Sequence, residues 1–387
     1  MTRIDLGELD RTGVRCRLSS EQAAALDASG LVSPRPVGGD DWQLLPVGRV
    51  GAVHFDGLDV QVLPKTGIAR LLFLLGYAKD PGVRPEDVTA SAERDLWPAL
   101  AESLVRQAER ALAPGVLQGY VAVDEALPLV RGRIRFADQW ARRPAQPLPI
   151  EVTYDDYTVD TAENRLLRTA LRRMAAVPRL PDSTRARLSH LDGRLDGVRL
   201  LPGGAILPKW RSSRLNARYL PALRLAELVL RHYSADPGPG GRGMAAFVVN
   251  MATVFEDFVT TALREALRGR PGRTESQYRT HLDKERTIPI RPDVVHVEAE
   301  RPVAVFDAKY KLEGPAADAY QMLAYCTALG LTTGWLIYAR GAPDSLHRYI
   351  RNTDINIIQF GLDLDAEPAD LLRQVTDLAN SALIGVC

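Results

Sequence analysis

Two neighbouring segments rich in apolar and β-branched residues constrain the fold of this chain most. Residues 288–297 and 302–311 each have the composition of a β-strand, and a short polar turn separates them. Because side chains alternate faces along a strand, Asp307 and Lys309 point the same way. Asp293, on the first strand, can meet them. The sequence therefore predicts a hairpin that carries two carboxylates and one ammonium.

This set of side chains suits phosphodiester hydrolysis. Two carboxylates offer the hard oxygen ligands that Mg²⁺ or Mn²⁺ binds, and a neighbouring lysine can orient or deprotonate a water. We therefore interpret Asp293 and Asp307 as metal ligands and Lys309 as catalytic. The strings Pro292-Asp293 and Asp307-Ala308-Lys309 resemble the PD-(D/E)xK nuclease motif. The alternative is a surface hairpin with ordinary charges, because short Asp-x-Lys strings also occur by chance.

The segments on either side favour the nuclease interpretation. Upstream, five apolar residues recur at helical spacing: Phe247, Met251, Phe255, Phe258 and Ala262. Glu256, on the flank of this stripe, is expected to help complete the metal shell. Downstream, Gln321 and Tyr325 share one face of a predicted helix. That spacing resembles the Gln-x-x-x-Tyr signature of RecB-like nucleases, so Gln321 is a further catalytic candidate and Tyr325 a structural one.

Length and composition indicate a globular protein of several parts. The 387 residues predict two or three domains, and with 25% charged residues the composition is ordinary for a globular chain. The net charge of +1 means that any DNA-binding surface must be a local patch. Cys16, Cys326 and Cys387 are far apart and odd in number, which argues against a disulfide framework and for a reducing compartment.

Four segments can be distinguished along the chain. For residues 1–78 the sequence predicts a β-rich, partner-binding domain with a hairpin turn at Asp56-Gly57 and a buried helix after it. Residues 79–235 predict a mixed α/β, mainly helical region. Residues 236–243 have the Gly/Pro content of a linker. Residues 244–387 predict the endonuclease domain, an α/β fold with a mixed sheet flanked by helices.

The middle region carries basic side chains that are candidates for DNA contact. Asp160 and Glu163 predict a capping box, and the helix they open has one arginine-rich face. Such a face is either solvated or a phosphate-binding surface. The residues we assign to DNA binding lie in two other basic strings: Arg131, Arg133, Arg135, Lys209 and Arg211.

Several classes of protein are not indicated. No string has the Gly-x-x-x-x-Gly-Lys-Ser/Thr pattern of a phosphate-binding loop, so we expect no nucleotide motor in this chain. The longest apolar run, residues 71–75, is too short to span a bilayer, and the first residues lack the apolar core of a secretory signal. We therefore expect a cytoplasmic protein with no membrane association.

Several strings together resemble the McrC family, the nuclease subunits of McrBC-type modification-dependent restriction systems. The resemblance covers most of the chain from about Val50 onward and is carried by these strings: Pro64-Lys65, Leu127-Pro-Leu-Val-Arg-Gly-Arg-Ile134, Tyr154-Asp-Asp-Tyr-Thr-Val-Asp-Thr-Ala-Glu-Asn-Arg165, Asn216-Ala-Arg-Tyr219, Phe255-Glu-Asp-Phe258 and Asp307-Ala-Lys-Tyr-Lys311.

The resemblance implies a Mg²⁺-dependent endonuclease of the PD-(D/E)xK type that acts on double-stranded DNA. It also implies a partner, an McrB-like AAA+ GTPase hexamer, whose GTP hydrolysis the chain stimulates and whose own domain reads modified cytosine. Two alternatives remain at this point. One is a stand-alone RecB-like nuclease, and the other is a non-catalytic adaptor of a AAA+ ring.

Overall fold

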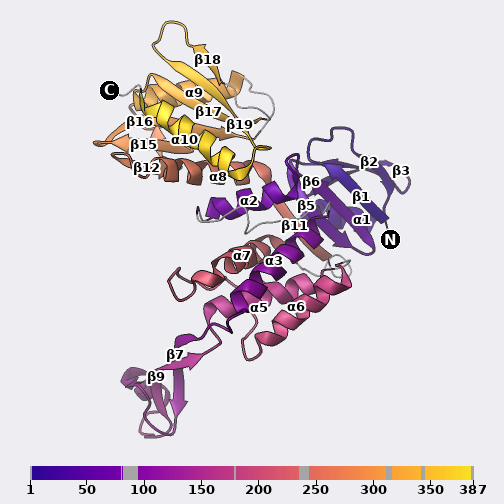
Figure 1. The fold of residues 1–387 in the computed structure, drawn as a ribbon, viewed down its shortest axis with the longest axis vertical. Coiled ribbons are helices and arrows are strands. Elements are labelled where there is room, and N and C mark those ends of the chain that lie inside the picture. Colours follow the sequence, from indigo (N-terminus) through magenta and orange to yellow (C-terminus); the bar gives the residue numbers. More distant parts are fainter. Residues whose placement is uncertain are drawn as a thin grey trace. The chain divides into compact units, whose positions relative to one another are not determined.

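The computed structural model has two compact units, Met1–Ala99 with His232–Cys387, and Leu100–Arg231 (Figure 1). It describes residues 2–79, 81, 95–177, 180–234, 244–310, 316–340 and 345–384. The predicted linker at 236–243, Lys311 and Cys387 lie outside these residues. The units differ from the predicted division, because the first unit joins residues from both ends of the chain. The physical reason is strand β11 (Met244–Asn250), which pairs antiparallel with β5 (Arg49–Phe55).

The first unit contains a five-stranded sheet built from both chain segments. Its order is β1 (Thr2–Gly7), β6 (Leu58–Leu63), β5, β11 and β10 (Tyr233–Ser234). The predicted turn at Asp56-Gly57 joins β5 to β6, with φ of 45° and 73°. Positive φ at both positions is what a two-residue hairpin turn requires. A three-stranded sheet and a helix complete this region: β2 (Val14–Arg17), β4 (Asp41–Pro46), β3 (Val32–Gly38) and α1 (Ser20–Ser29).

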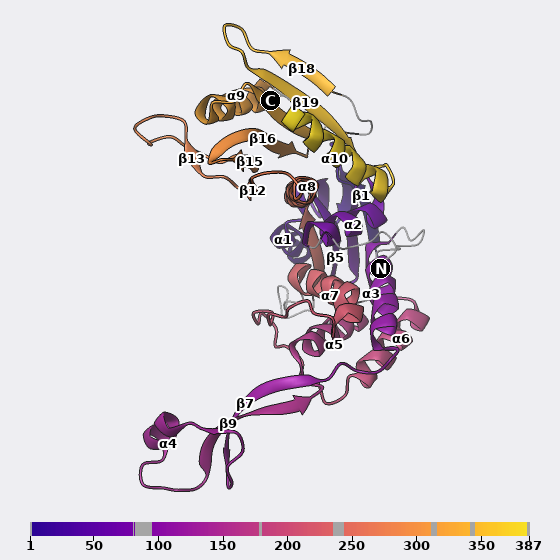
Figure 2. The same cartoon turned by 60° about the vertical axis from the view of Figure 1, so that its left-hand side comes forward.

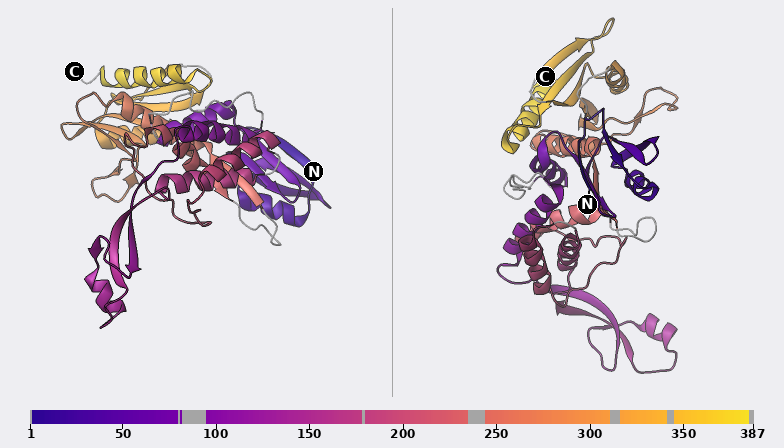
Figure 3. Two further views of the ribbon diagram at one scale, coloured as in Figure 1. Left: turned by 60° about the horizontal axis from the view of Figure 1, so that its bottom comes forward. Right: turned by 90° about the vertical axis from the view of Figure 1, so that its right-hand side faces the viewer.

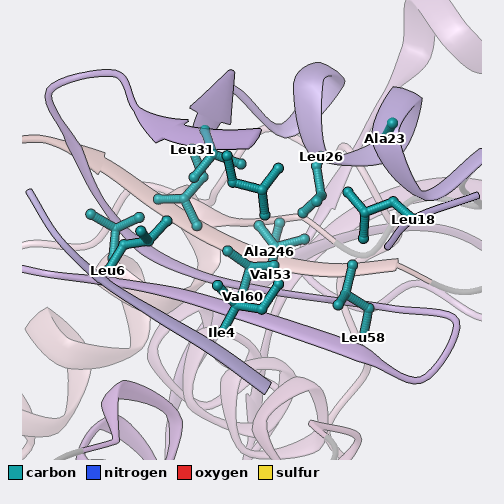
Figure 4. Packing of buried hydrophobic residues seen from close by; sticks show 13 residues of the cluster. Ile4, Leu6, Leu18, Ala23, Leu26, Leu31, Val53, Leu58, Val60 and Ala246 are labelled. Carbon is teal, nitrogen blue, oxygen red and sulfur yellow. The ribbon is translucent and has the colours of Figure 1, made fainter. Parts of the chain in front are cut away.

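One apolar core holds this region together (Figure 4). Ile4, Val53 and Val60 come from the five-stranded sheet, Leu26 comes from α1, and all are buried. Ala246 of β11 belongs to the same cluster. The start of the predicted endonuclease segment is therefore part of the N-terminal core.

The second sheet of the first unit has six strands in mixed orientation. Its order is β12 (Arg273–Ser276), β15 (Val294–Glu298), β16 (Arg301–Lys309), β17 (Thr333–Arg340), β19 (Asn356–Asp363) and β18 (Ser345–Tyr349). The predicted hairpin is confirmed as β15 and β16, although residues 289–290 form a separate short strand, β14 (Pro289–Ile290), which pairs with β13 (Thr280–His281). Strand β16 is antiparallel to β15 and parallel to β17. The predicted mixed sheet is confirmed.

Helices cover both faces of this sheet. Met322 and Tyr325 of α9 (Ala316–Leu329) pack against Val305 and Leu336 on one face. Helices α8 (Met251–Ala266) and α10 (Pro368–Ile384) contact each other and β16. Figure 2 shows α9 and α10 on opposite sides of β19, and Figure 3 shows α10 running along the C-terminal strands.

The helical stripe predicted from Phe247 is wrong at its first member. Phe247 lies in β11, and α8 begins only at Met251, with the Asn250 side chain accepting hydrogen bonds from the amides of Ala252 and Thr253. A buried strand followed directly by an apolar helix imitates one continuous helical stripe. The other four members lie on α8 as expected.

Helix α2 (Gly67–Lys79) confirms the helix predicted after Pro64, and it packs on α8. The Phe258 ring centroid lies 6.2 Å from that of Phe73 and 5.5 Å from that of Tyr77. The Thr261 hydroxyl donates a hydrogen bond of 2.9 Å to the Ala78 carbonyl. The N-terminal segment therefore contacts the helix that carries Glu256.

The second unit combines helices with a protruding β-ribbon (Figures 1 and 2). Its main helices are α3 (Leu96–Leu112), α5 (Ala162–Ala175), α6 (Asp182–Arg194) and α7 (Leu220–His232), preceded by a short 3-10 helix, η2 (Ala217–Tyr219). The ribbon consists of β7 (Gly119–Leu127), β9 (Ile150–Thr158), β8 (Arg133–Ile134) and α4 (Phe136–Arg142). The predicted, mainly helical character is confirmed.

The capping box predicted from Asp160 and Glu163 is wrong. Thr161 is the N-cap, and its hydroxyl accepts a hydrogen bond from the Asn164 amide. The Asp160 carboxylate instead binds the guanidinium groups of Arg165 and Arg199, with shortest distances of 2.6 Å to each. Because Asp160 is bound to two arginines, Thr161 is the residue that caps the helix.

Candidate active site

The hairpin brings the two predicted carboxylates together. The β15–β16 register pairs Val294 with Phe306, and its continuation by one residue places Asp293 opposite Asp307. The Ala308 amide donates a hydrogen bond of 2.9 Å to Asp293 Oδ2, which fixes that side chain against β16. Asp307 is only 2% exposed. A buried aspartate beside a second carboxylate costs free energy, which makes this strand end a candidate functional site.

Lys309 lies between Asp307 and α9. Its ammonium forms an ion pair with Asp307 Oδ2 and donates a hydrogen bond of 2.8 Å to Gln321 Oε1. The structure thus places the predicted Asp307, Lys309 and Gln321 in one connected group. The Tyr325 hydroxyl donates to the Arg291 carbonyl at 3.3 Å, and this residue belongs to the core beneath α9. The sequence-based expectation that Tyr325 is structural agrees with this position.

Glu256 approaches the same group from α8 through a residue that the sequence did not indicate. The Gln277 side-chain amide donates one hydrogen bond to Glu256 Oε1 and one of 3.2 Å to Asp293 Oδ1. Gln277 also has a φ of 52°, which is uncommon for a residue other than glycine. Its backbone amide donates to the Asp293 carbonyl at 2.7 Å. Gln277 therefore links Glu256 to Asp293.

The electrostatics of the site reflect an excess of negative charge. Burial, followed by the repulsion of Asp293, raises the pKa of Asp307 to about 7 although Lys309 acts in the opposite direction. Burial, followed by Asp293, Asp257 and Asp307, raises the pKa of Glu256 to about 7. Within the described part of the chain, Lys309 forms an ion pair with Asp307, and its charge does not offset the repulsion among the neighbouring carboxylates. A bound cation would relieve this repulsion.

The donor set fits a hard divalent cation. Asp307 Oδ2 is buried and forms an ion pair with Lys309. Within the described part of the chain, this oxygen accepts no hydrogen bond of regular geometry. Carboxylate oxygens are the ligands that Mg²⁺ and Mn²⁺ prefer. In the residues that the structure describes, no three His, Cys, Asp or Glu side chains already have the geometry of a metal site. At present the Gln277 amide lies between Glu256 and Asp293.

The first group of predicted DNA-binding residues lies on the β-ribbon of the second unit. Arg133 is exposed, whereas the Arg131 guanidinium pairs with Asp156 at 3.0 Å and lies 3.9 Å from the Tyr154 ring centroid. Arg135 is 14% exposed, and its carboxylate partners are Asp124, Asp138 and Glu151. Arg133 is therefore the most available of the three, and Arg135 mainly holds the ribbon together.

The second group lies in the segment before η2. Lys209 and Arg211 are both exposed, and the Arg211 carbonyl accepts a hydrogen bond of 2.8 Å from Asn216. Between them, Trp210 is partly buried and its indole donates a hydrogen bond of 2.8 Å to Glu227. Tyr219 is fully buried. Both aromatic side chains therefore take part in packing.

The fold and the strand-end cluster define a mixed α/β protein with an acidic site of nuclease-like composition. The chain belongs to the family described as "McrBC 5-methylcytosine restriction system component", whose model matches residues 46–339. The resemblance to this restriction system seen in the sequence is therefore confirmed. No curated protein matches the chain.

Two solved structures are similar to the chain. One is a chain of the refined half-complex from a tetradecameric assembly of Thermococcus gammatolerans McrB AAA+ hexamers with bound McrC, with a TM-score of 0.62 and 17% identity. That match covers 98% of this chain and 100% of the other, so the two share a fold over their whole lengths. The second is from the Thermococcus gammatolerans McrBC complex, with a TM-score of 0.43, 18% identity, and coverage of 69% and 88%.

No helix within the described ranges is long and apolar enough to cross a membrane.

Proposed function

We propose that this chain is the nuclease subunit of an McrBC-type restriction system and cleaves duplex DNA with Mg²⁺ or Mn²⁺. The observation that carries the proposal is the convergence of Asp293, Asp307 and Lys309 at one strand end, with Glu256 and Gln321 beside them. A hairpin, a preceding acidic helix and a following Gln-x-x-x-Tyr helix also support assignment to the PD-(D/E)xK class.

The chemistry derives from what each side chain can do at this position. Asp293 and Asp307 would hold the cation through carboxylate oxygens, with Glu256 as a further donor. A bound divalent cation supplies polarisation of the scissile phosphate and activation of a water. Lys309, held between Asp307 and Gln321, donates hydrogen bonds toward the attacking water and the phosphate oxygens. Its positive charge then stabilises the negative charge that develops during hydrolysis.

The partner is proposed from the family and the shared fold. We infer that an McrB-like AAA+ GTPase hexamer binds this chain, and that the chain stimulates GTP hydrolysis and cuts DNA containing modified cytosine. A chain with net charge +1 and a few available arginines is expected to bind DNA weakly by itself. The motor then supplies the duplex and holds it at the site.

Reconstitution tests this proposal. The purified chain is mixed with an McrB-like AAA+ GTPase from the same organism, GTP, Mg²⁺ and plasmid DNA with or without 5-methylcytosine. We expect cleavage only when chain, motor and GTP are all present, and we expect Asp307→Ala to stop cleavage while GTPase stimulation persists. Robust site-selective cleavage by the chain with Mg²⁺ alone would favour a stand-alone nuclease. GTPase stimulation without any cleavage of modified or unmodified DNA would favour an adaptor.

A further inference from the structure

Tyr310 directly follows the candidate catalytic lysine and is anchored on the other side of the sheet. Its ring packs against Phe255 of α8, with 5.9 Å between centroids. Its hydroxyl donates a hydrogen bond of 2.7 Å to Oε1 of Glu8, the residue after β1. The residue beside Lys309 is therefore attached to the N-terminal region of the same unit.

Lys65 joins this anchor to the next strand. Its backbone amide donates to the same Glu8 oxygen at 2.9 Å, and its ammonium lies 4.7 Å from the Tyr310 ring centroid. The ammonium also donates a hydrogen bond of 2.8 Å to the Ala339 carbonyl of β17. Because Lys309 pairs with Tyr338 in the β16–β17 register, Tyr310 and Ala339 continue the two strands side by side. Lys65 thus spans both strands just beyond the catalytic lysine.

This Glu8–Lys65–Tyr310 cluster is too polar to be explained by core packing alone. Glu8 is 8% exposed, and two donors converge on one of its oxygens. Burial and the adjacent Glu8 raise the pKa of Tyr310, so its hydroxyl remains a donor. Buried polar groups of this kind specify one geometry, because every alternative leaves a donor or acceptor unpaired. The cluster also accounts for Pro64-Lys65, a string without a role in the proposed chemistry.

We propose that Tyr310 is a positioning residue for Lys309, held in place by Glu8 and Lys65 of the N-terminal segment. The proposal rests on the proposed nuclease function. Lys309 and Tyr310 share a peptide bond at the end of β16, so a shift of the Tyr310 ring moves the Lys309 backbone and its ammonium. A misplacement of about 1 Å at a catalytic group can cost about 10²-fold in rate. Anchoring of the strand end therefore keeps Lys309 in register with Asp307 and Gln321.

The first test measures single-turnover DNA cleavage in the reconstituted complex. Tyr310→Phe keeps the ring and removes the hydroxyl, and Glu8→Ala removes its acceptor. We expect each to slow the cleavage step by about 10-fold without changing the DNA concentration for half-maximal rate. The double variant should be no slower than Glu8→Ala, because Glu8→Ala already removes the hydrogen bond from Tyr310 together with the one from the Lys65 amide. Glu8→Gln, which retains an acceptor oxygen, should restore most of the rate.

The matched control is Thr261→Val. It removes the hydroxyl bond from α8 to the Ala78 carbonyl, which also joins the N-terminal segment to α8 but does not involve Tyr310. This variant should cleave at the normal rate. If it slows cleavage as much as Tyr310→Phe does, general loosening of the N-terminal contact explains the effect, and the positioning role is refuted.

A second readout separates this inference from the nuclease assignment. The rate of Lys309 acetylation by an N-hydroxysuccinimide ester is measured in the full chain by peptide mass spectrometry, without partner or DNA. We expect several-fold faster labelling in Tyr310→Phe and Glu8→Ala, and no change in Thr261→Val. Faster labelling without any wild-type cleavage would preserve the positioning role and contradict only the nuclease function. Unchanged labelling and cleavage in Tyr310→Phe would overturn the positioning role.

Discussion

Two regions of this chain hold acidic side chains with little exposure, and they differ in how the negative charge is compensated. Around α5, Asp160 lies between Arg165 and Arg199, and Asp192 accepts from Arg168 at 3.0 Å and Arg172 at 2.6 Å. Each of these carboxylates has two guanidinium partners. At the end of β16, Asp307 forms an ion pair with Lys309 and lies beside the negatively charged Asp293.

The opposite pKa shifts of the two regions express this difference. Burial alone would raise the pKa of Asp160, but hydrogen bonds from Arg165 and Arg199 outweigh it and hold that pKa well below its ordinary value. At Asp307, burial and Asp293 dominate, and the pKa rises to about 7. A carboxylate paired with arginines stabilises the fold. A buried carboxylate with too little positive charge around it costs stability, and proteins retain such a group where a bound cation or substrate neutralises it. We therefore interpret the first region as structural and propose the second as the catalytic site.

The largest expected effect concerns Lys309 of the acidic cluster. Lys309→Met keeps most of the side-chain volume but removes the charge that we propose stabilises the transition state. We expect single-turnover cleavage by the reconstituted complex to fall on the order of 10²- to 10⁴-fold. Arg168→Met, which removes a partner of Asp192 near α5, should leave the cleavage rate unchanged at a temperature where both variants are folded. A comparable loss in both variants would abolish the contrast between the regions.

Removal of the negative charge of Asp307 should stabilise the cation-free protein. Because the folded pKa of Asp307 is raised to about 7, the native state holds its proton more tightly than the unfolded state. Its contribution to stability therefore decreases as pH rises from about 4 to about 7 and stays low above that. We expect Asp307→Asn to raise the free energy of unfolding at pH 8 by roughly 2–4 kcal/mol. Urea denaturation in EDTA measures this, and a loss of stability would contradict it.

Near α5, where Asp160 is paired with arginines, removal of the negative charge should lower the free energy of unfolding. The pKa of Asp160 is lowered in the folded state, so its stabilisation is complete above about pH 4 and disappears as pH falls toward the folded value. We expect Asp160→Asn to cost about 2 kcal/mol at pH 7. The same denaturation experiment at pH 7 and pH 3 should show the deficit shrinking in acid. A deficit that is equal at both pH values would indicate that packing, not charge pairing, is lost.

The smallest effect concerns DNA affinity. Arg133 is exposed on the ribbon, whereas Arg135 is paired with carboxylates. If Arg133 neutralises one phosphate, Arg133→Ala should reduce the slope of log affinity against log salt by about 0.9. Arg135→Ala should lower thermal stability with the slope unchanged. Fluorescence anisotropy with a labelled duplex measures the slope, and an identical slope for wild type and Arg133→Ala would remove Arg133 from the DNA-binding surface.

The local part of the site was predictable because it depends on short spacings. Strand alternation placed Asp307 and Lys309 on one face. The resemblance of Gln321 and Tyr325 to the Gln-x-x-x-Tyr signature selected Gln321, which accepts a hydrogen bond from Lys309. Errors arose where adjacent elements overlap in pattern. Phe247 lies in a strand that runs directly into an apolar helix, and Thr161 rather than the neighbouring Asp160 is the N-cap of α5.

The distant part of the site could not be predicted from spacing. Gln277 reaches Asp293 from another strand segment, and Glu8 meets Tyr310 across about three hundred residues of sequence. Such contacts depend on how β11 joins the first sheet and α2 packs on α8, which no periodicity encodes. One signal was present in the Pro64-Lys65 string, whose resemblance to the family had no explanation until Lys65 was found beside Tyr310.

Plasmid cleavage by the reconstituted complex tests the central claim most directly. Wild type, Asp307→Asn and Asp160→Asn are compared with motor, GTP and Mg²⁺ at one pH, and GTP hydrolysis is recorded in the same samples. We predict that Asp307→Asn loses cleavage but still stimulates GTP hydrolysis, and that Asp160→Asn, although less stable, cuts at the wild-type rate. Cleavage at the wild-type rate by Asp307→Asn would show that the unmatched carboxylates at the end of β16 are not the catalytic site.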